Sequence, residues 1–479
     1  MLDIKRKEII EKLLQQLDLL DTNGVCVALS GGLDSVVLLD IITKALLGTK
    51  YNLKTIHINH NLSPNAKEWV KHCKLVCERL GVEYESYSII MQKQNRQSLE
   101  ELAREKRYKV FAKALVDKEV LLTAHHRDDM AETFLLNALR GSGVSGLASI
   151  APFRQFEGLN IIRPLLECSR EELEKYAKDN KLEWIEDESN DDLSFRRNYL
   201  RHKIIPLLQN EFPGVSTCLA RSAKLCATSN ELCEDLAKLD LDVIEGDHYI
   251  NYNIIVNHTF RRKANIVRLW LKKYALRAPS NAKLEEFLRQ CEFAAEDKQP
   301  QLLVDNKLLR AYKGKIYLTR KDWLAGQLEA VTMLWQITLD EVETLPDNST
   351  LTAIPVSKES YLAMNEIERK EIISLPDVVH IKFREGSDKH PVINGKKISL
   401  KEYCQENEVL PWLRAYLPLI HIDGEVVSIA GNINKKPDLN IKNQSLYKVL
   451  WKKSIRIPTL DEERAMAKKT SSENSLIFF

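Results

Sequence analysis

The first 125 residues alternate short apolar runs with longer helical patterns, and this alternation restricts the possible folds more than any other feature of the sequence. The run Val-Cys-Val-Ala-Leu at 25–29 is almost wholly apolar, which is typical of a strand buried on both faces. The same alternation continues, with strand patterns at 54–59, 83–90 and 119–124 and helical patterns at 35–46, 66–80 and 98–116. It predicts an α/β, Rossmann-like domain whose parallel sheet has helices on both faces.

The alternation stops near residue 212, and two other patterns follow. The segment Glu-Phe-Pro-Gly at 211–214 indicates a boundary, and helical patterns come after it. Beyond about residue 300, short apolar runs separated by turn signals indicate strands. We therefore predict an α/β catalytic domain at 1–212, a mainly helical domain at 213–330, a small strand-rich α+β domain at 331–459 and a flexible tail at 460–479.

Composition excludes several classes of protein. Hydrophobic residues make up 44% of the chain and charged residues 29%, which is ordinary for globular domains and excludes wholesale disorder. No apolar run approaches the roughly 18 residues that span a bilayer, so we expect no membrane association. The nine cysteines include no C-x-x-C pair, which indicates neither a disulfide framework nor a zinc or iron–sulfur site. We expect reduced thiols in a cytoplasmic protein.

A glycine pair follows the first predicted strand, in a segment that runs Ser30, Gly31, Gly32, Leu33, Asp34, Ser35. Backbone N–H groups beside the glycines, the N-terminus of the next helix and the hydroxyl groups together suit a phosphate. Because Asp34 would repel phosphate unless a cation lay between them, the loop predicts ATP-binding residues and a Mg²⁺ ligand, Asp34. The alternative is an ordinary glycine-rich turn in which Asp34 and Ser35 cap the helix.

The loop resembles the S-G-G-x-D-S loop of the N-type ATP pyrophosphatases, which cleave ATP to AMP and pyrophosphate while adenylating a substrate oxygen. Further stretches resemble, in order, the motifs of the tRNA(Ile)-lysidine synthetases; they lie at 57–66, 98–108, 123–133, 140–143, 162–166 and 184–190. The resemblance is dense over about residues 20–205 and weaker from 299 to 420, as in the longer, three-domain members.

This resemblance implies a ligase that joins the ε-amino group of free L-lysine to C2 of the wobble cytidine in an isoleucine tRNA with a CAU anticodon. ATP first adenylates the cytidine O2, and lysine then displaces AMP to give lysidine. The tRNA then reads AUA instead of AUG and accepts isoleucine instead of methionine. The implied ligands are ATP, Mg²⁺, L-lysine and this tRNA. The sequence does not determine the oligomeric state, for which a homodimer is one option.

Two acids of the 123–133 segment are candidates for the lysine site. Asp129 and Glu132 lie three residues apart at the start of a predicted helix, which puts both carboxylates on one face. Carboxylates suit an ammonium group, and the resemblance implies that this pair binds lysine. The alternative is a pair of acids that only complement the helix dipole.

Lysine must lose a proton before it attacks, because its side-chain pKa is about 10.4. The candidate acceptors are His125, His126 and the two carboxylates; the sequence does not choose among them, and we assign His125 to the catalytic set with Asp34. We also assign Arg107 to this set, because an arginine can contact the triphosphate or the departing pyrophosphate. The alternative, for Arg107 and for Arg104, is an ion pair on the helix surface. His60 follows the second predicted strand, and we expect it to contact ATP. The alternative is that it only caps its loop.

Two basic stretches are candidates for contacts to the tRNA backbone. One follows the last motif of the first domain and contributes Arg196, Arg197 and Arg201. The other, at 260–277, contains no acid and contributes Arg261, Arg262 and Lys263. The alternative interpretation of this second stretch is that its charges form the solvated face of an amphipathic helix. By family analogy, contacts to the acceptor stem come from Lys396, Lys397, Lys401 and Arg414.

Two other functions compete with lysidine formation. A tRNA 2-thiolation enzyme of the same ATP pyrophosphatase group would need reactive cysteines, whereas Cys73 and Cys77 share only a helical spacing. A non-catalytic tRNA-binding protein would have no use for Asp34 together with the acids at 129 and 132.

Overall fold

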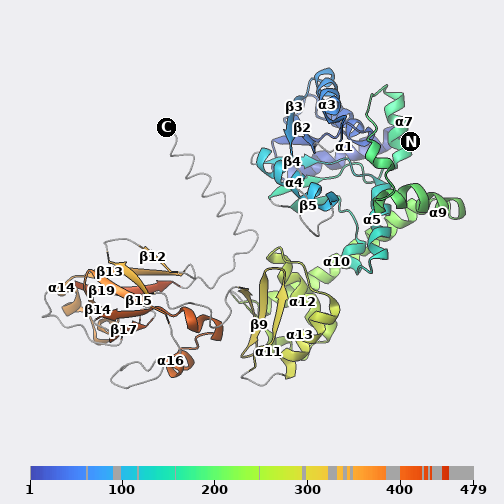
Figure 1. Cartoon of the computed structure of the whole chain (residues 1–479). Helices are drawn as coiled ribbons and strands as arrows, with labels where there is room; N and C mark the ends of the chain where they lie inside the picture. The colour runs from blue at the N-terminus through green and yellow to red at the C-terminus, as the bar shows by residue number, and fades with distance from the viewer. Residues whose placement is uncertain are drawn as a thin grey trace. The chain divides into compact units, whose positions relative to one another are not determined.

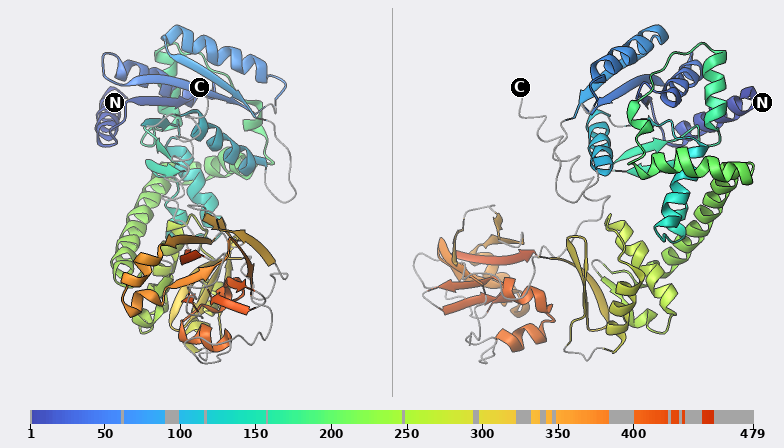
Figure 2. Two further views of the ribbon diagram at one scale, coloured as in Figure 1. Left: turned by 90° about the vertical axis from the view of Figure 1, so that its left-hand side faces the viewer. Right: turned by 45° about the vertical axis from the view of Figure 1, so that its right-hand side comes forward.

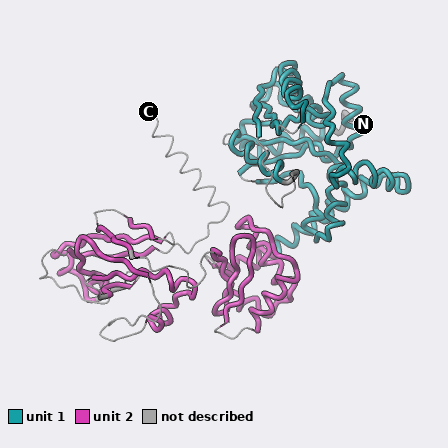
Figure 3. Tube along the Cα trace, in the orientation of Figure 1, with its two compact units in different colours: residues 1–236, 466–479 teal, residues 237–465 magenta. Residues whose placement is uncertain are grey.

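The structure of the chain is a computed structural model, whose described residues divide into two compact units between Leu236 and Ala237 (Figure 3). The description covers residues 2–60, 63–89, 99–115, 118–156, 158–246, 249–293, 298–321, 332–337, 342–345, 349–383, 400–422, 425–429, 432–433 and 445–452. Within these ranges, no helix combines the length and the apolar character needed to cross a membrane.

A six-stranded sheet forms the centre of the first unit, in the order β3-β2-β1-β4-β6-β5 (Figure 1). Its strands are β1 (Gly24–Ala28), β2 (Asn52–Asn59), β3 (Glu83–Ser88), β4 (Glu119–Leu122), β5 (Phe153–Phe156) and β6 (Leu159–Ile162). All neighbours pair in parallel except β5 and β6, so the predicted parallel sheet is confirmed. The antiparallel edge strand β5 was not predicted; Gly158, at a φ of 84°, permits its tight turn into β6.

Helices cover both faces of this sheet, as predicted (Figure 1). Val25 and Val27 of β1 pack into one core with α1, α2 and α7, whereas Cys26 points to the other face and packs with Tyr108 and Phe111 of α4. The helices of this unit before α10 are α1 (Leu2–Leu19), α2 (Leu33–Leu46), α3 (Ala66–Leu80), α4 (Leu99–Ala114), α5 (Arg127–Leu139), α6 (Val144–Leu147), α7 (Arg170–Asp179), a 3₁₀ turn (Glu188–Asp191), α8 (Arg196–Tyr199), a π-helical turn (Leu200–Ile204) and α9 (Ile205–Glu211).

The carboxyl ends of the central strands meet at one edge of the sheet. β1 pairs in parallel with β2 on one side and with β4 on the other, with Gly24 opposite both Asn52 and Glu119. The segments that follow these strands therefore lie next to one another, and α2 and α5 begin there. This is the edge at which ligands bind in open α/β sheets.

Helix α10 (Val215–Ile244) follows Pro213-Gly214 and contains the division between the two units. Its second half packs into the core of the next part of the chain, which combines helices with an antiparallel sheet in the order β7-β10-β9-β8. The remaining elements of this part are β7 (Tyr249–Asn251), α11 (Tyr252–Ile255), α12 (Phe260–Lys273), α13 (Asn281–Phe293), β8 (Gln301–Val304), β9 (Lys307–Tyr312) and β10 (Lys315–Arg320).

The last described part is rich in strands, as predicted, and contains two antiparallel sheets (Figure 2). One has the order β11-β15-β16-β17-β18 and the other β12-β13-β19-β14, and side chains such as Trp335, Leu351 and Ile381 share a core. The elements are β11 (Thr332–Gln336), β12 (Val342–Thr344), β13 (Thr350–Val356), α14 (Lys358–Ala363), α15 (Glu366–Arg369), β14 (Ile372–Leu375), β15 (Val378–Lys382), α16 (Leu400–Glu406), a 3₁₀ turn (Pro411–Tyr416), β16 (Leu419–Ile422), β17 (Glu425–Ile429), β18 (Asn432–Ile433) and β19 (Ser445–Lys452).

Candidate active site

The segment between β1 and α2 forms a tight loop with its own hydrogen bonds. The Ser30 N–H donates to Ser35 Oγ at 3.2 Å, and Ser35 Oγ donates to the Gly32 carbonyl at 2.9 Å. Gly31 has a φ of 88°, and a Cβ atom there would lie 2.9 Å from Cys73 Sγ, so a side chain is excluded twice over. Ser35 is buried and braces the loop, while the N–H groups of the first turn of α2 have no acceptor within the helix. The loop thus has the backbone donors that an anion requires.

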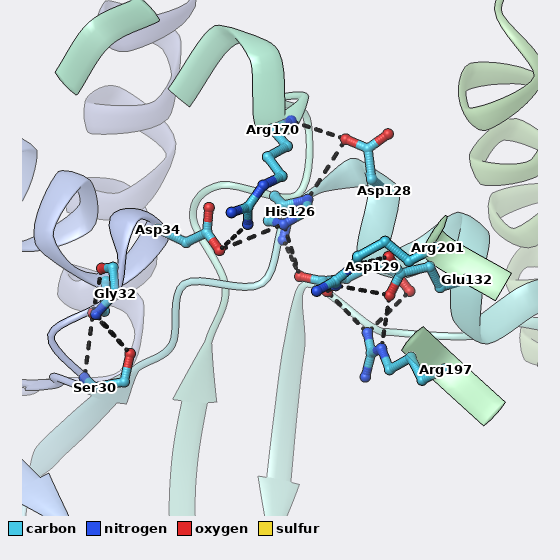
Figure 4. A network of polar contacts seen from close by, with 11 residues as sticks. Ser30, Gly32, Asp34, His126, Asp128, Asp129, Glu132, Arg170, Arg197 and Arg201 are labelled. Carbon is cyan, nitrogen blue, oxygen red and sulfur yellow. Dashed lines mark hydrogen bonds and ion pairs between the residues drawn. The ribbon is translucent and has the colours of Figure 1, made fainter. Parts of the chain in front are cut away.

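Asp34 lies at the start of α2 and faces two cationic side chains (Figure 4). Its Oδ2 is 3.2 Å from Arg170 Nη1 and 3.7 Å from His126 Nε2. Its Oδ1 is buried and has no hydrogen-bond partner among the described residues. Burial raises the pKa of Asp34, against the opposing effect of the charges on His126 and Arg170. A buried carboxylate oxygen without a partner fits a cation ligand.

No group of three or more His, Cys, Asp or Glu side chains within the described ranges has an arrangement that would hold a metal ion. A Mg²⁺ at Asp34 would therefore take most of its ligands from phosphate oxygens and water, as is usual for this ion in nucleotide sites. The residues present fit such an ion.

The imidazole of His126 is almost completely buried, with 1% of its side chain exposed, and lies among three carboxylates (Figure 4). Its Nε2 is 3.5 Å from Asp129 Oδ2 and 3.7 Å from Asp34 Oδ2, and its Nδ1 is 3.6 Å from Asp128 Oδ2. Burial opposes the charged form, but the carboxylates of Asp129, Asp128 and Asp34 outweigh it and raise the pKa of His126. His126 thus links the phosphate loop to α5, and its carboxylate neighbours favour the charged form of the imidazole.

The two predicted lysine-binding acids lie together and are engaged by two arginines (Figure 4). Arg197 donates from Nη2 to Asp129 Oδ1 at 2.9 Å and from Nε to Glu132 Oε2 at 2.8 Å. Arg201, one turn later, donates from Nε to Glu132 Oε1 at 2.6 Å and from Nη2 to Glu132 Oε2 at 3.0 Å. We call these four side chains the acid–arginine quartet. Against the effect of burial, the charges of His126 and Arg197 lower the pKa of Asp129.

Three segments of the chain match known domain families: residues 4–208 match the PP-loop domain, 256–317 the TilS substrate binding domain and 379–451 the TilS substrate C-terminal domain. The tRNA(Ile)-lysidine synthase of Coxiella burnetii (strain RSA 493 / Nine Mile phase I) is 33% identical over 424 residues, which cover 88% of this chain and 92% of that protein. The chain belongs to the tRNA(Ile)-lysidine synthase family. A relative from Vibrio parahaemolyticus serotype O3:K6 (strain RIMD 2210633) is 32% identical over 409 residues, 85% of this chain and 90% of that protein.

Membership of the lysidine synthase family confirms the resemblance predicted from the motifs, and the cysteines are consistent with it. The alternative of a thiolation enzyme requires a reactive thiol. Cys73 and Cys77 are buried, and burial raises the pKa of the Cys73 thiol to about 12. Both side chains belong to the core between α2 and α3, so neither has the environment of a sulfur carrier.

Two further predicted site residues of the family's nucleotide domain, His60 and Arg107, interact electrostatically. Burial, with the positive charge of Arg107 in second place, lowers the pKa of His60 to about 4, so its imidazole is neutral near pH 7. Arg107 also lies over the ring of Tyr108, 5.9 Å from its centroid. Asn61, which follows His60, lies outside the described residues.

His125 is engaged at one ring nitrogen: its Nδ1 is 2.9 Å from Thr123 Oγ1. Burial, with smaller effects from nearby arginines, lowers its pKa to about 3, although Asp129 acts in the opposite direction. His125 is therefore a neutral imidazole in any ordinary assay buffer. Its neighbour His126 has the opposite electrostatics, which the adjacent positions in the sequence do not reveal.

The predicted tRNA-binding residues fall into exposed and engaged groups. Arg196 and Arg261 are exposed. Arg197 and Arg201 belong to the acid–arginine quartet, and Arg262 makes a two-point contact with Asp240 at 3.0 and 2.7 Å. Within the described part of the chain, Arg196 and Arg261 are therefore the residues of this set whose charge is exposed and makes no ion pair.

Lys263 requires a correction. It is buried, with 5% of the residue exposed, and its Nζ donates to the Tyr252 hydroxyl at 3.2 Å and to Glu292 Oε2 at 3.1 Å. An ammonium group inside the domain cannot contact a phosphate on its surface, so the prediction that Lys263 binds tRNA is wrong. Of the proposed acceptor-stem contacts, Lys401 is exposed, Arg414 donates to the Val409 carbonyl at 3.1 Å, and 396–397 lie outside the described residues.

Two residues of the site were missed by the sequence analysis. Arg170, at the start of α7, faces Asp34, and its backbone N–H donates to Asp128 Oδ2 at 2.9 Å. Burial opposes ionisation of Asp128, but His126 and the Arg170 N–H lower its pKa to about 2. Ser169 was one signal of this position in the sequence, because it caps α7 and so makes Arg170 the first residue of that helix.

Proposed function

We propose that this chain joins free L-lysine to the wobble cytidine of an isoleucine tRNA with a CAU anticodon, forming lysidine with ATP as the activating substrate. One observation carries the proposal: the His126 imidazole lies 3.7 Å from Asp34 and 3.5 Å from Asp129. A phosphate site and an ammonium site on either side of one ring suit a reaction in which an amine attacks a phosphate-activated atom. The names of the relatives support the product and the RNA.

The phosphate loop and the residues around it would bind ATP. Backbone N–H groups at the start of α2 would hold the triphosphate, with His60 and Arg107 near the nucleotide. Asp34 would hold Mg²⁺ through its buried, unpartnered oxygen. The ion would screen the charge on the phosphates and favour departure of pyrophosphate. Arg170, which faces Asp34, would neutralise negative charge on the same side.

The reaction would take place in two steps. The cytidine O2 attacks the α-phosphorus of ATP, the bond to pyrophosphate breaks, and an adenylated cytidine results. The lysine ε-amine then attacks C2, the C2–O bond breaks, and AMP leaves. The amine must give up a proton, and the raised pKa of His126 favours the charged imidazole, a form that cannot accept one. The acceptor would be a carboxylate of the site or His125, whose low pKa keeps its imidazole neutral.

The finer assignments belong to the same proposal. We assign Asp129 and Glu132 to lysine, and Arg196 and Arg261 to the tRNA backbone because both are exposed. The unpaired bases of an anticodon loop can enter a pocket at less cost than bases of a duplex, which favours a wobble cytidine as the base that reacts. A cytoplasmic location, a homodimer and the domain limits 1–212, 213–330, 331–459 and 460–479 stay predictions.

The test is incubation of the purified chain with ATP, Mg²⁺, labelled L-lysine and unmodified isoleucine tRNA with a CAU anticodon. We expect label in the RNA, with AMP and pyrophosphate formed in equal amounts. Asp34→Asn keeps the size of the side chain but removes the charge, and we expect it to abolish pyrophosphate release while tRNA affinity changes less than threefold. Unlabelled RNA from a folded wild-type protein would refute the proposal.

A further inference from the structure

Helix α10, the long light-green helix of Figure 2, bears a stripe of apolar side chains on the face that the described residues leave uncovered. Its opposite face is buried, with Ala223 in one core and Ala237 and Leu241 in another. At about 100° per residue, five exposed side chains fall within a sector roughly 60° wide. These residues, which we call the α10 stripe, are 43% to 72% exposed and comprise Leu225, Leu232, Leu236, Leu239 and Val243.

The α10 stripe has the spacing of a coiled-coil seam. Leu225, Leu232 and Leu239 recur every seven residues. Leu236 and Val243 follow the second and the third of these leucines by four residues. The three leucines therefore occupy heptad position d and the other two residues position a, which is the pattern by which one helix packs along another. The two earlier a positions hold serines, so the apolar seam runs over about 27 Å of the helix. Its natural partner is a second helix.

The charges beside the α10 stripe make it complementary to a second copy of itself. Along one flank, heptad position g holds Arg221 in the first half of α10 and Asp235 and Asp242 in the second half. Arg221 and Asp242 are both exposed. Two antiparallel copies would place Arg221 beside the partner's Asp242, and the two-fold axis would repeat this ion pair. Two parallel copies would instead place Asp235 beside the partner's Asp240, so that like charges meet.

We propose that the α10 stripe binds a second copy of this chain, with the two α10 helices antiparallel about a two-fold axis. Each d position then packs against an a position of the other helix, so that Leu225 lies against the partner's Leu236. Burial of five large side chains from each copy supplies the driving force. The surface contains none of the residues assigned to ATP, lysine or tRNA, so the inference is independent of the proposed reaction.

Other occupants fit this surface less well. An RNA backbone requires cations, and the five residues of the stripe carry none. An anionic membrane surface requires cations beside the apolar residues, whereas Asp235 and Asp242 border this stripe. A helix of a different protein could pack on the seam, but it would leave the self-complementary order of the charges without a role.

The first experiment measures the oligomeric state of the full chain by analytical ultracentrifugation. A single helix pair buries less than the roughly 800 Å² per partner of a standard interface, so we expect a monomer–dimer equilibrium with a Kd of about 1–10 μM. Leu232→Lys puts a charge into the seam of both copies and should raise this Kd at least on the order of 100-fold. Leu19→Lys, at an exposed leucine of α1, is the matched control and should change it less than about twofold. Thermal melting verifies that both variants are folded.

Reversal of the flanking charges tests which residues face each other. Arg221→Asp would place two carboxylates together at each end of the helix pair, and Asp242→Arg would place two guanidinium groups together. We expect each single variant to raise the Kd of the dimer about tenfold. The double variant restores opposite charges and should return the Kd to within about twofold of the wild type.

The native cysteines test the direction of the two helices. In the antiparallel pair, Cys226 lies beside the partner's Cys233, on the flank away from Arg221. In a parallel pair, Cys218, which is exposed and at position d, would instead lie opposite the partner's Cys218. A short bismaleimide should therefore give a covalent dimer on a denaturing gel. We expect Cys226→Ser to abolish this dimer and the matched control Cys218→Ser to retain it.

Three results would overturn the proposal. A folded wild type that stays monomeric at about 100 μM would show that the α10 stripe binds no second copy. A dimer whose Kd is the same in Leu232→Lys would place the interface elsewhere on the chain. Crosslinking that requires Cys218 and not Cys226 would contradict the antiparallel arrangement. Lysine incorporation is measured separately, so failure of this inference and failure of the proposed function are distinguishable.

Discussion

At the scale of single residues, the charge on His126 links stability to pH. Although burial opposes it, the carboxylates of Asp129, Asp128 and Asp34 raise the pKa of His126 above the value of about 6.5 that it has when unfolded. A group whose pKa is higher in the folded state binds protons more tightly there. Its contribution to stability is therefore complete below pH 6.5 and is lost as the pH rises through the raised, folded-state pKa.

We expect the variant His126→Gln to lack this contribution. The difference in urea midpoint between wild type and variant should be largest near pH 6 and should shrink steadily toward pH 9. The measurement is a series of urea unfolding curves at constant ionic strength, with Arg196→Gln as an exposed control whose midpoint follows the wild type at every pH. A difference that grew with pH would mean that His126 is neutral in the folded protein.

Residue types and spacing predicted the members of the site better than their contacts. The spacing of Asp129 and Glu132 placed both on one face of a helix, and Asp34 followed from the need for a cation beside phosphate. The sequence did not indicate that Arg197 and Arg201, more than 60 residues away, engage those acids. That contact depends on how α8 and the π-helical turn pack against α5, which is a tertiary property.

At the scale of elements, α12 shows why a run of charges has to be considered together with helical phase. Lys263 shares a face with Val267 and Trp270, at spacings of four and seven residues, and all three are buried. Periodicity alone would have moved Lys263 from the basic surface to the core. Pairing of Arg262 with Asp240 of α10 could not be found in this way, because the two residues lie on different helices.

Substitutions in α12 should separate the buried lysine from the exposed arginine. We expect Lys263→Met to lower the free energy of unfolding by about 1–3 kcal/mol, because it leaves the Tyr252 hydroxyl and the Glu292 carboxylate without their buried partner. Arg261→Gln, two residues earlier and exposed, should change it by less than about 0.5 kcal/mol. Urea unfolding of the full chain measures both values. Equal destabilisation by the two variants would contradict the assignment of Lys263 to the core.

At the scale of the whole molecule, the formal charge of +2 conceals how charge is distributed. The chain has 70 basic and 68 acidic side chains, but several arginines and lysines are committed to acids inside the units. Exposed basic residues such as Arg196 and Arg261 remain for a polyanion. Affinity for RNA depends on this local distribution and not on the total. For the same reason, a nearly neutral composition did not exclude an RNA partner.

Binding of the tRNA should therefore depend steeply on salt despite the small net charge. With about four phosphate contacts, the affinity should fall roughly 50- to 150-fold between 50 and 200 mM salt. The double variant Arg196→Gln, Arg261→Gln should reduce the slope of log Kd against log salt by about the amount that two phosphate contacts contribute. Lys263→Gln removes the same kind of charge from the interior and should leave the slope unchanged. Fluorescence anisotropy with labelled tRNA at five salt concentrations gives the slopes. An equal loss of slope in Lys263→Gln would mean that total charge, and not exposed charge, controls binding.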